Sequence, residues 1–180
     1  ALSRMVEVIT QTDHFQEVHY PDAEADYLDF RAEAVIDGWK LIYREQDEYV
    51  LQMGLKLLDA VYTTMVSKVD AEATIERNGI IFDSPYGNAI AVVTKNSQVN
   101  DIAQKRGYKL VVRRHPQQQS VNIKAPPPNL MKGEKSSIDL TQLYKTLQAK
   151  DPRADWFLHA SKTMLLNGSA KNPNMKPTTL

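Results

Sequence analysis

The first 78 residues carry apolar side chains at the three-to-four spacing of amphipathic helices. Pro21 interrupts the pattern, and Asn78-Gly79 ends it with a dipeptide that is typical of helix C-termini. Asp22 and Asp47 stand where a helix N-cap is expected. We therefore expect three helices: residues 2–12, Asp22 to about Tyr43, and Asp47–Asn78.

Beyond Gly79 the apolar positions form short runs separated by turn residues, a pattern typical of strands. The runs that predict strands are residues 80–82, 89–93, 108–112, 121–123, 156–158 and 164–166. Two stretches predict helices between them: residues 97–106, and a segment that Asp139 caps and Asp151-Pro152 ends. This order predicts an α+β fold, in which helices pack on a small mixed sheet.

The change of pattern near Gly79 divides the chain into two parts. Residues 1–78 are expected to form a helical segment, and residues 79–180 are expected to form the α+β domain. The helical segment would either connect two domains or pack on the sheet.

Composition narrows the class of protein. Of the 180 residues 42% are hydrophobic, and 22 acidic side chains balance 22 basic ones. The balance argues against a general nucleic-acid coat protein but leaves room for a local basic cleft. The absence of cysteine excludes disulfides, thiolate metal sites and a cysteine nucleophile. Because no apolar run is long enough to span a bilayer, we expect no membrane partner. A cytoplasmic location is expected as compatible with the absence of cysteine and of a secretory apolar segment.

The richest candidate chemistry lies between residues 154 and 169. Two apolar runs alternate with two polar tips, His159-Ala160-Ser161-Lys162 and Asn167-Gly168-Ser169. If the tips lie close together, their imidazole, hydroxyl, amide and ammonium groups suit an anion. The alternative is an ordinary hairpin, because Asn-Gly is a strong turn signal.

Three segments together resemble the DHH phosphoesterase superfamily, and more narrowly the prokaryotic relatives of the nuclease family named for a melanocyte-proliferation gene. They are residues 6–15, the strands 89–93, 110–114 and 121–124, and Phe157-Leu158-His159-Ala160-Ser161. The sequence departs from that family in two ways. The eponymous Asp-His-His is absent, and Lys162 to Leu166 stand where the family has Gly-Gly.

The resemblance implies that this chain is the C-terminal, substrate-binding part of a larger metal-dependent phosphoesterase. The complete protein would use Mn²⁺ or Mg²⁺ on a nucleotide or short nucleic acid, and this chain need not bind either ion. Asp13 would be a metal ligand, or else an ordinary helix-end residue. Since one carboxylate cannot complete a two-metal site, we expect the chain alone to be inactive. The alternatives are a non-catalytic phospholigand-binding module and an interaction protein, for example a homo-oligomer that the helical part assembles.

The predicted substrate contacts follow from the same comparison. His159, Ser161 and Lys162 would form one wall of the site, and the other would comprise Asn167, Gly168, Ser169 and Lys171. Arg113 and Arg114 end a strand, so alternation sends them to opposite faces and at most one meets a cleft. The alternative for His159 is a satisfied core histidine, and for each arginine a solvated strand end. Trp156 and Phe157 are expected in the core.

Overall fold

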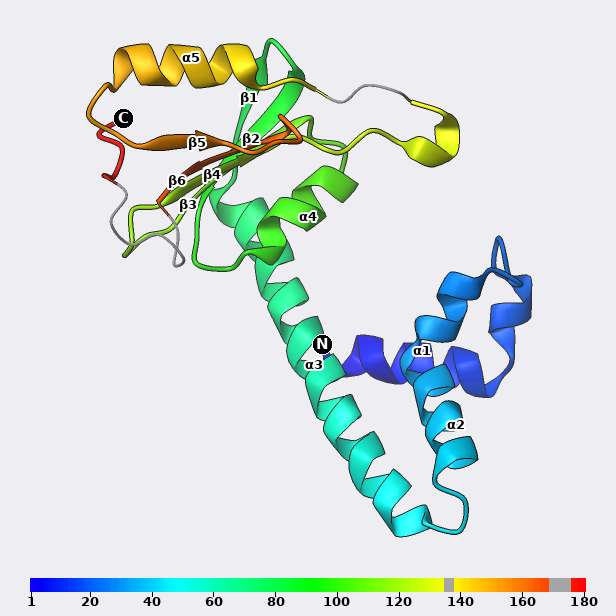
Figure 1. Cartoon of the computed structure of the whole chain (residues 1–180). Coiled ribbons are helices and arrows are strands. Elements are labelled where there is room, and N and C mark those ends of the chain that lie inside the picture. The colour runs from blue at the N-terminus through cyan, green and yellow to red at the C-terminus, as the bar shows by residue number, and fades with distance from the viewer. Residues whose placement is uncertain (135–137, 169–175) are drawn as a thin grey trace. The chain divides into compact units, whose positions relative to one another are not determined.

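The computed structural model describes residues 1–134, 138–168 and 176–180, and it divides into two compact units (Figure 1). The first unit comprises Ala1–Val69 and the second Asp70–Leu180. The expected α+β fold is confirmed: a helical N-terminal part is followed by a six-stranded mixed sheet with helices packed on it. No helix in the described ranges combines the length and the apolar character that crossing a bilayer requires.

The first unit consists of helices. They are α1 (Leu2–Asp13), η1 (Gln16–His19), η2 (Asp26–Phe30), α2 (Ala32–Ile42) and most of α3 (Asp47–Asn78). The expected helices at 2–12 and Asp47–Asn78 are confirmed. The single helix expected from Asp22 to Tyr43 is wrong, because Asp22 has a φ of 61° and Arg31 is extended, so that α2 begins only at Ala32. Aspartates are frequent before Ala32, and their side chains compete for backbone groups in turns.

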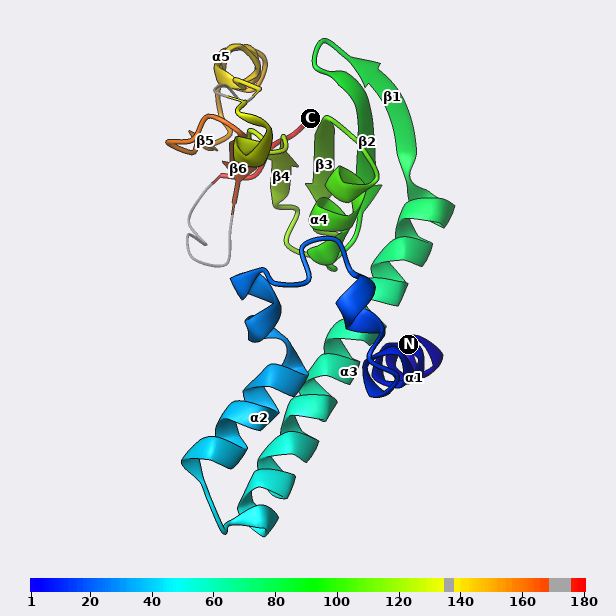
Figure 2. The ribbon, with the colours of Figure 1, turned by 90° about the vertical axis from the view of Figure 1, so that its right-hand side faces the viewer.

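The second unit is built on a six-stranded sheet. Its strands are β1 (Ile80–Ser84), β2 (Gly87–Val93), β3 (Leu110–Arg114), β4 (Val121–Lys124), β5 (Trp156–Leu158) and β6 (Met164–Asn167). They lie in the order β1-β2-β3-β4-β6-β5, as Figure 2 shows from the side. The β2–β3 pair is parallel and the other pairs are antiparallel. The predicted turn from Ser84 to Gly87 joins β1 to β2, and the Ser84 hydroxyl donates to Gly87 O over 2.7 Å.

Helices cover the two faces of the sheet differently. On one face, α4 (Gln98–Lys105) and the end of α3 pack on β2 and β3 around a core of seven side chains: Ala71, Ile75, Ile90, Val92, Val99, Ala103 and Val111. On the other face, α5 (Thr141–Lys150) packs on a core that includes Ile123, Leu140, Trp156 and Leu165. Figure 1 shows α4 and α5 on opposite sides of the sheet. The last turns of α3, from Asp70 on, therefore belong to the sheet unit. The boundary predicted near Gly79 lies after these turns.

Candidate functional site

The predicted His159 tip is the tight turn that joins β5 to β6. His159 N–H donates to Met164 O over 2.9 Å, and Lys162 N–H donates to His159 O over 2.8 Å. Lys162 completes the turn with a φ of 58°, a left-handed conformation. The backbone thus places the His159 side chain at the end of the hairpin, where it is exposed. The alternative of a satisfied core histidine is excluded by this exposure.

Hydrogen bonds within the turn determine which imidazole nitrogen of His159 carries the hydrogen. Ser161 N–H donates to His159 Nδ1 over 3.1 Å, and a backbone amide can only donate. Nδ1 is therefore the acceptor, and Nε2 carries the hydrogen of the neutral ring. The Ser161 hydroxyl lies 2.8 Å from the same Nδ1, and the Thr163 hydroxyl lies 2.9 Å from that of Ser161. Ser161 thus holds the imidazole of His159 through Nδ1 and leaves Nε2 without a partner among the described residues.

The His159 side chain shares a face of the sheet with Phe157. Their ring centroids lie 6.5 Å apart in an edge-to-face arrangement. The alternation along β5 places both on the face opposite α5, where Phe157 is 50% exposed. The expectation that Phe157 lies in the core is wrong, because α5 covers the other face and α4 packs on β2 and β3, away from β5. Trp156 is 8% exposed, so the expectation that it lies in the core is confirmed.

Lys124, which was not among the predicted substrate contacts, also lies on the face opposite α5. Lys124 of β4 stands opposite Met164 of β6, and Met164 O accepts the backbone hydrogen of His159. Lys124 and His159 therefore flank Met164 in one row across the sheet. Ile123 is buried in the core under α5, so alternation directs Lys124 to the face opposite α5. Alternation in Val121–Lys124 was visible in the sequence, but the β4–β6 pairing was not.

Arg113 belongs to the neighbouring row on the same face. It stands opposite Asn122 of β4, which in turn stands opposite Leu166 of β6. Its Nη1 donates to Thr94 O over 3.3 Å. Burial lowers the pKa of the Arg113 guanidinium from its ordinary value. Its bond to the backbone makes Arg113 partly structural, unlike Lys124.

The expectation that the two polar tips lie close together is wrong. Trp156 pairs with Asn167, whereas His159 bonds to Met164, so the tips stand at opposite ends of β6. The Asn167 side chain is fully buried: its Nδ2 donates to Asp155 O and Lys176 O, and its Oδ1 accepts from Thr178 N–H. Asn167 therefore holds the C-terminal segment in place.

Gly168 and Lys162, also predicted as substrate contacts, make contacts within the protein. Gly168 has a φ of 73°, and a Cβ there would lie 3.3 Å from Ser120 Cβ, so Gly168 packs against the β3–β4 loop. Lys162 Nζ lies 3.3 Å from Asp139 Oδ2, in an exposed ion pair. Ser169 and Lys171 lie outside the described residues.

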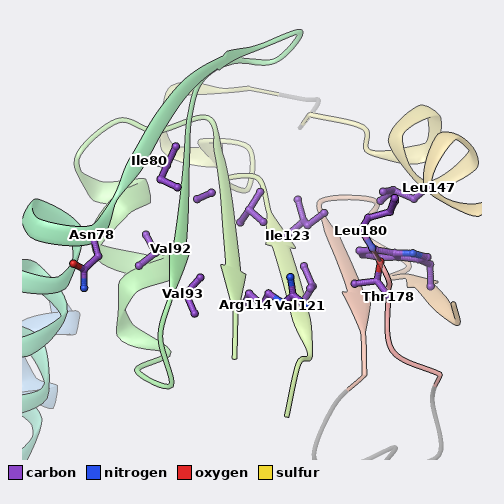
Figure 3. Close-up of a pocket in the computed structure, with 13 residues that line it drawn as sticks. Asn78, Ile80, Val92, Val93, Arg114, Val121, Ile123, Leu147, Thr178 and Leu180 are labelled. Atoms are coloured by element: carbon purple, nitrogen blue, oxygen red, sulfur yellow. Dashed lines mark hydrogen bonds between the residues drawn. The ribbon is translucent and has the colours of Figure 1, made fainter. Parts of the chain in front are cut away.

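Arg114 lies on the other face of the sheet, as alternation requires. It lines a cavity of about 640 Å³ whose walls are mainly apolar (Figure 3). Arg113 is absent from that lining. A ligand on the His159 face therefore contacts Arg113 at most, because the sheet separates it from Arg114.

Asp13 ends α1 and is exposed. Within the described ranges, no three histidine, aspartate or glutamate side chains gather as a metal site would require. The described residues therefore do not fit a two-metal centre, and Asp13 alone does not form one.

No protein-family model matches the chain, and no curated protein matches it either. The DHH resemblance thus rests on the three segments quoted above.

Proposed function

We propose that the sheet unit is the substrate-binding portion of a metal-dependent phosphoesterase that acts on nucleotides or short nucleic acids. The observation that carries the proposal is the hydrogen-bonded His159 turn. With Nδ1 occupied by Ser161, the exposed Nε2–H is the free donor of the ring. A phosphate oxygen is a suitable acceptor for it, and a hydrogen bond to a charged group is about twice as strong as a neutral one.

The neighbours of His159 support a nucleotide as the ligand. Lys124, in the same row, has no carboxylate partner within the described ranges, and its ammonium group can neutralise a phosphate. Phe157, beside His159, exposes half of an aromatic ring on which a base can stack. On the face opposite α5, the imidazole and ammonium groups can thus bind the phosphate of a mononucleotide, and the aromatic ring can stack on its base.

The role that we assign to this chain is binding. The described residues do not gather into a metal site, so ligands for Mn²⁺ or Mg²⁺ would have to come largely from elsewhere in the complete protein. Such ions would polarise the phosphoryl group and activate water when bound. His159 and Lys124 would hold the phosphate and orient it, and Ser161 would keep the His159 donor in place.

The proposal is tested by titrating the 180-residue chain with adenosine monophosphate, and with adenosine as the ligand that lacks the phosphate. Calorimetry should detect the nucleotide and much weaker binding of the nucleoside. His159→Ala should weaken nucleotide binding about 10- to 100-fold, the equivalent of a hydrogen bond to a charged group. Lys124→Gln should weaken it by a smaller factor.

His115 offers a matched control for His159. It also lies in a turn between strands, and its Nδ1 also accepts backbone hydrogens, from Gln117 and Gln118. It follows β3 at the end of the sheet away from His159. His115→Ala should therefore leave nucleotide binding unchanged. Equal losses in the two histidine variants, or equal binding of adenosine, would refute the assignment of the site.

A second candidate function, a non-catalytic phospholigand-binding module, is favoured by the isolated position of Asp13. Titration with Mn²⁺ alone separates the two. Paramagnetic broadening of the Asp13 amide resonance, lost in Asp13→Asn, would favour the phosphoesterase portion. Nucleotide binding with no effect of Mn²⁺ at Asp13 would favour the non-catalytic module.

A further inference from the structure

The cavity that Arg114 lines lies on the α5 face of the sheet, remote from the His159 face. Its floor consists of two rows that cross β2, β3 and β4: Ala91, Val112 and Ile123 in one, and Val93, Arg114 and Val121 in the other. Ile80 of β1 borders one side, and Leu147, Thr178 and Leu180 border the other (Figure 3). Trp156 of β5 also belongs to the lining. A volume of about 640 Å³ is within the range of small-molecule sites.

The guanidinium of Arg114 lacks a partner in this cavity. Among the described residues, no hydrogen bond or ion pair of its side chain is found, although the residue is partly buried. The lining contains no aspartate or glutamate side chain, and the α-carboxylate that ends the 180-residue chain at Leu180, also in the lining, forms no ion pair with Arg114. The residues outside the described ranges, 135–137 and 169–175, are also free of acidic side chains. A partly buried cation without an anion is costly, and a bound anion removes that cost.

Trp156 also lines the cavity, and its indole N–H is buried. Its side chain is only 8% exposed, and its Nε1–H is buried without an acceptor in the part of the chain that the structure describes. A buried indole N–H normally has a hydrogen-bond partner. Because Nε1 has almost no accessible surface, the Trp156 ring contributes apolar surface to the cavity rather than a donor. The cavity thus combines the unpaired Arg114 guanidinium with apolar walls, so a ligand that fits it brings an anionic group and an apolar body.

We propose that this cavity binds a small monoanionic carboxylate with an extended apolar body, whose head group the Arg114 guanidinium receives. Arginine binds a carboxylate through two parallel hydrogen bonds, and one guanidinium balances one negative charge. A phosphate monoester would leave a second charge without a partner among apolar walls. The valine, isoleucine and alanine side chains of the floor would contact the body of the ligand across the three strands.

Decanoate is a suitable probe, and 1-decanol is the matched ligand without charge. Trp39 and Trp156 are the two tryptophans, so Trp39→Phe makes the fluorescence report on Trp156 alone. Titration of that 180-residue variant with decanoate, below its micellar concentration, should change the Trp156 emission saturably. Decanol should bind at least about 10-fold more weakly, because it lacks the charged hydrogen bonds.

Arg114→Gln should weaken decanoate binding at least about 10-fold and leave decanol binding unchanged. Arg113→Gln is the matched control, because it removes the neighbouring guanidinium from the opposite face and should not alter decanoate binding. Arg114→Lys keeps the charge but loses the paired hydrogen bonds, so it should give an intermediate affinity. Circular dichroism of each variant checks the fold.

Equal binding of decanoate to the wild-type chain and to Arg114→Gln would overturn the proposal, because it would indicate partition onto exposed apolar surface. The absence of saturable binding, or stronger binding of decanol, would overturn it as well. The outcome is independent of the nucleotide proposal, since His159→Ala should leave decanoate binding intact.

Discussion

The two units differ in how many of the apolar side chains they bury. In the helical unit, residues 1–69, Val50 is the one buried hydrophobic side chain, and many large apolar side chains are exposed, among them Leu41 and Phe30. The sheet unit buries two clusters, one on each face. Amphipathic spacing predicts helices equally well in either setting, but burial requires a second surface, which in the sheet unit is the sheet.

Helix α3 contains both situations in one continuous element. Leu51 and Leu55, in its first half, are about half exposed, whereas Ala71 and Ile75, near its end, are buried against the sheet. All four residues belong to one uninterrupted helix. The difference comes from what the side chains meet, so the helical unit should gain little stability from its apolar positions.

The largest expected contrast is between two leucine truncations. Leu165→Ala removes a side chain with no exposure from the core under α5 and should lower the free energy of unfolding by about 2–5 kcal/mol. Leu41→Ala, at a position 70% exposed, should change it by less than about 0.5 kcal/mol. Urea denaturation of the Trp39→Phe chain measures both, because Trp156 fluorescence reports on the sheet unit and far-ultraviolet circular dichroism reports on the helices that make up the helical unit. Similar decreases in the free energy of unfolding for the two variants would contradict this contrast, because they would mean that Leu41 is packed in a core.

Two glycine substitutions should have opposite signs. Gly79→Ala places a Cβ against Ile75 O and 2.7 Å from Ile90 Cδ1, so it should destabilise the sheet unit by about 1–3 kcal/mol. Gly54→Ala, within α3, meets only Ile36 Cδ1 at 3.9 Å and should stabilise its helix by about 0.5–1 kcal/mol. Thermal unfolding followed by circular dichroism would measure both changes. A stabilising Gly79→Ala would contradict the close packing of α3 on β2.

The smallest expected effect is acid sensitivity at Asp151. Thr179 N–H and the Thr178 hydroxyl donate to its carboxylate over 2.8 and 2.7 Å. These two bonds hold the pKa of Asp151 below its ordinary value, and the bond from Thr179 has the larger effect. A depressed pKa stabilises the fold at pH values above about 4, and the contribution is lost as the pH falls through the folded-state pKa. Asp151→Asn should therefore reduce stability at pH 7 and flatten its acid dependence.

Asp37, an exposed aspartate of the helical unit, provides the control for Asp151. Asp37 pairs with Lys40 on the surface, where both side chains are more than 60% exposed. Asp37→Asn should therefore leave both the stability at pH 7 and its acid dependence unchanged. Urea denaturation at pH 7 and at pH 3 gives both quantities. An equal response of the two variants would mean that Asp151 does not anchor the C-terminal segment.

The sequence predicted much of the fold. The long helix ending before Gly79, the six strands and the turn at Ser84-Gly87 all agree with the structure, because each depends on local periodicity or on turn chemistry. The helix expected from Asp22 failed where local competition by aspartates outweighed the apolar spacing. Much less of the candidate site could be predicted, since its residues come from strands whose pairing is not local.

The sequence by itself determined most of the helices and strands, the segment before Ala32 excepted, and that Arg113 and Arg114 point to opposite faces, because helical and strand periodicity are properties of consecutive residues. Tertiary structure alone decided that β4 pairs with β6, which places Lys124 and His159 on either side of Met164 and separates His159 from Asn167. It also decided that α5 covers one face and leaves Phe157 exposed on the other. Pairing and coverage depend on contacts between distant segments, and a one-residue change of register would reverse every side chain.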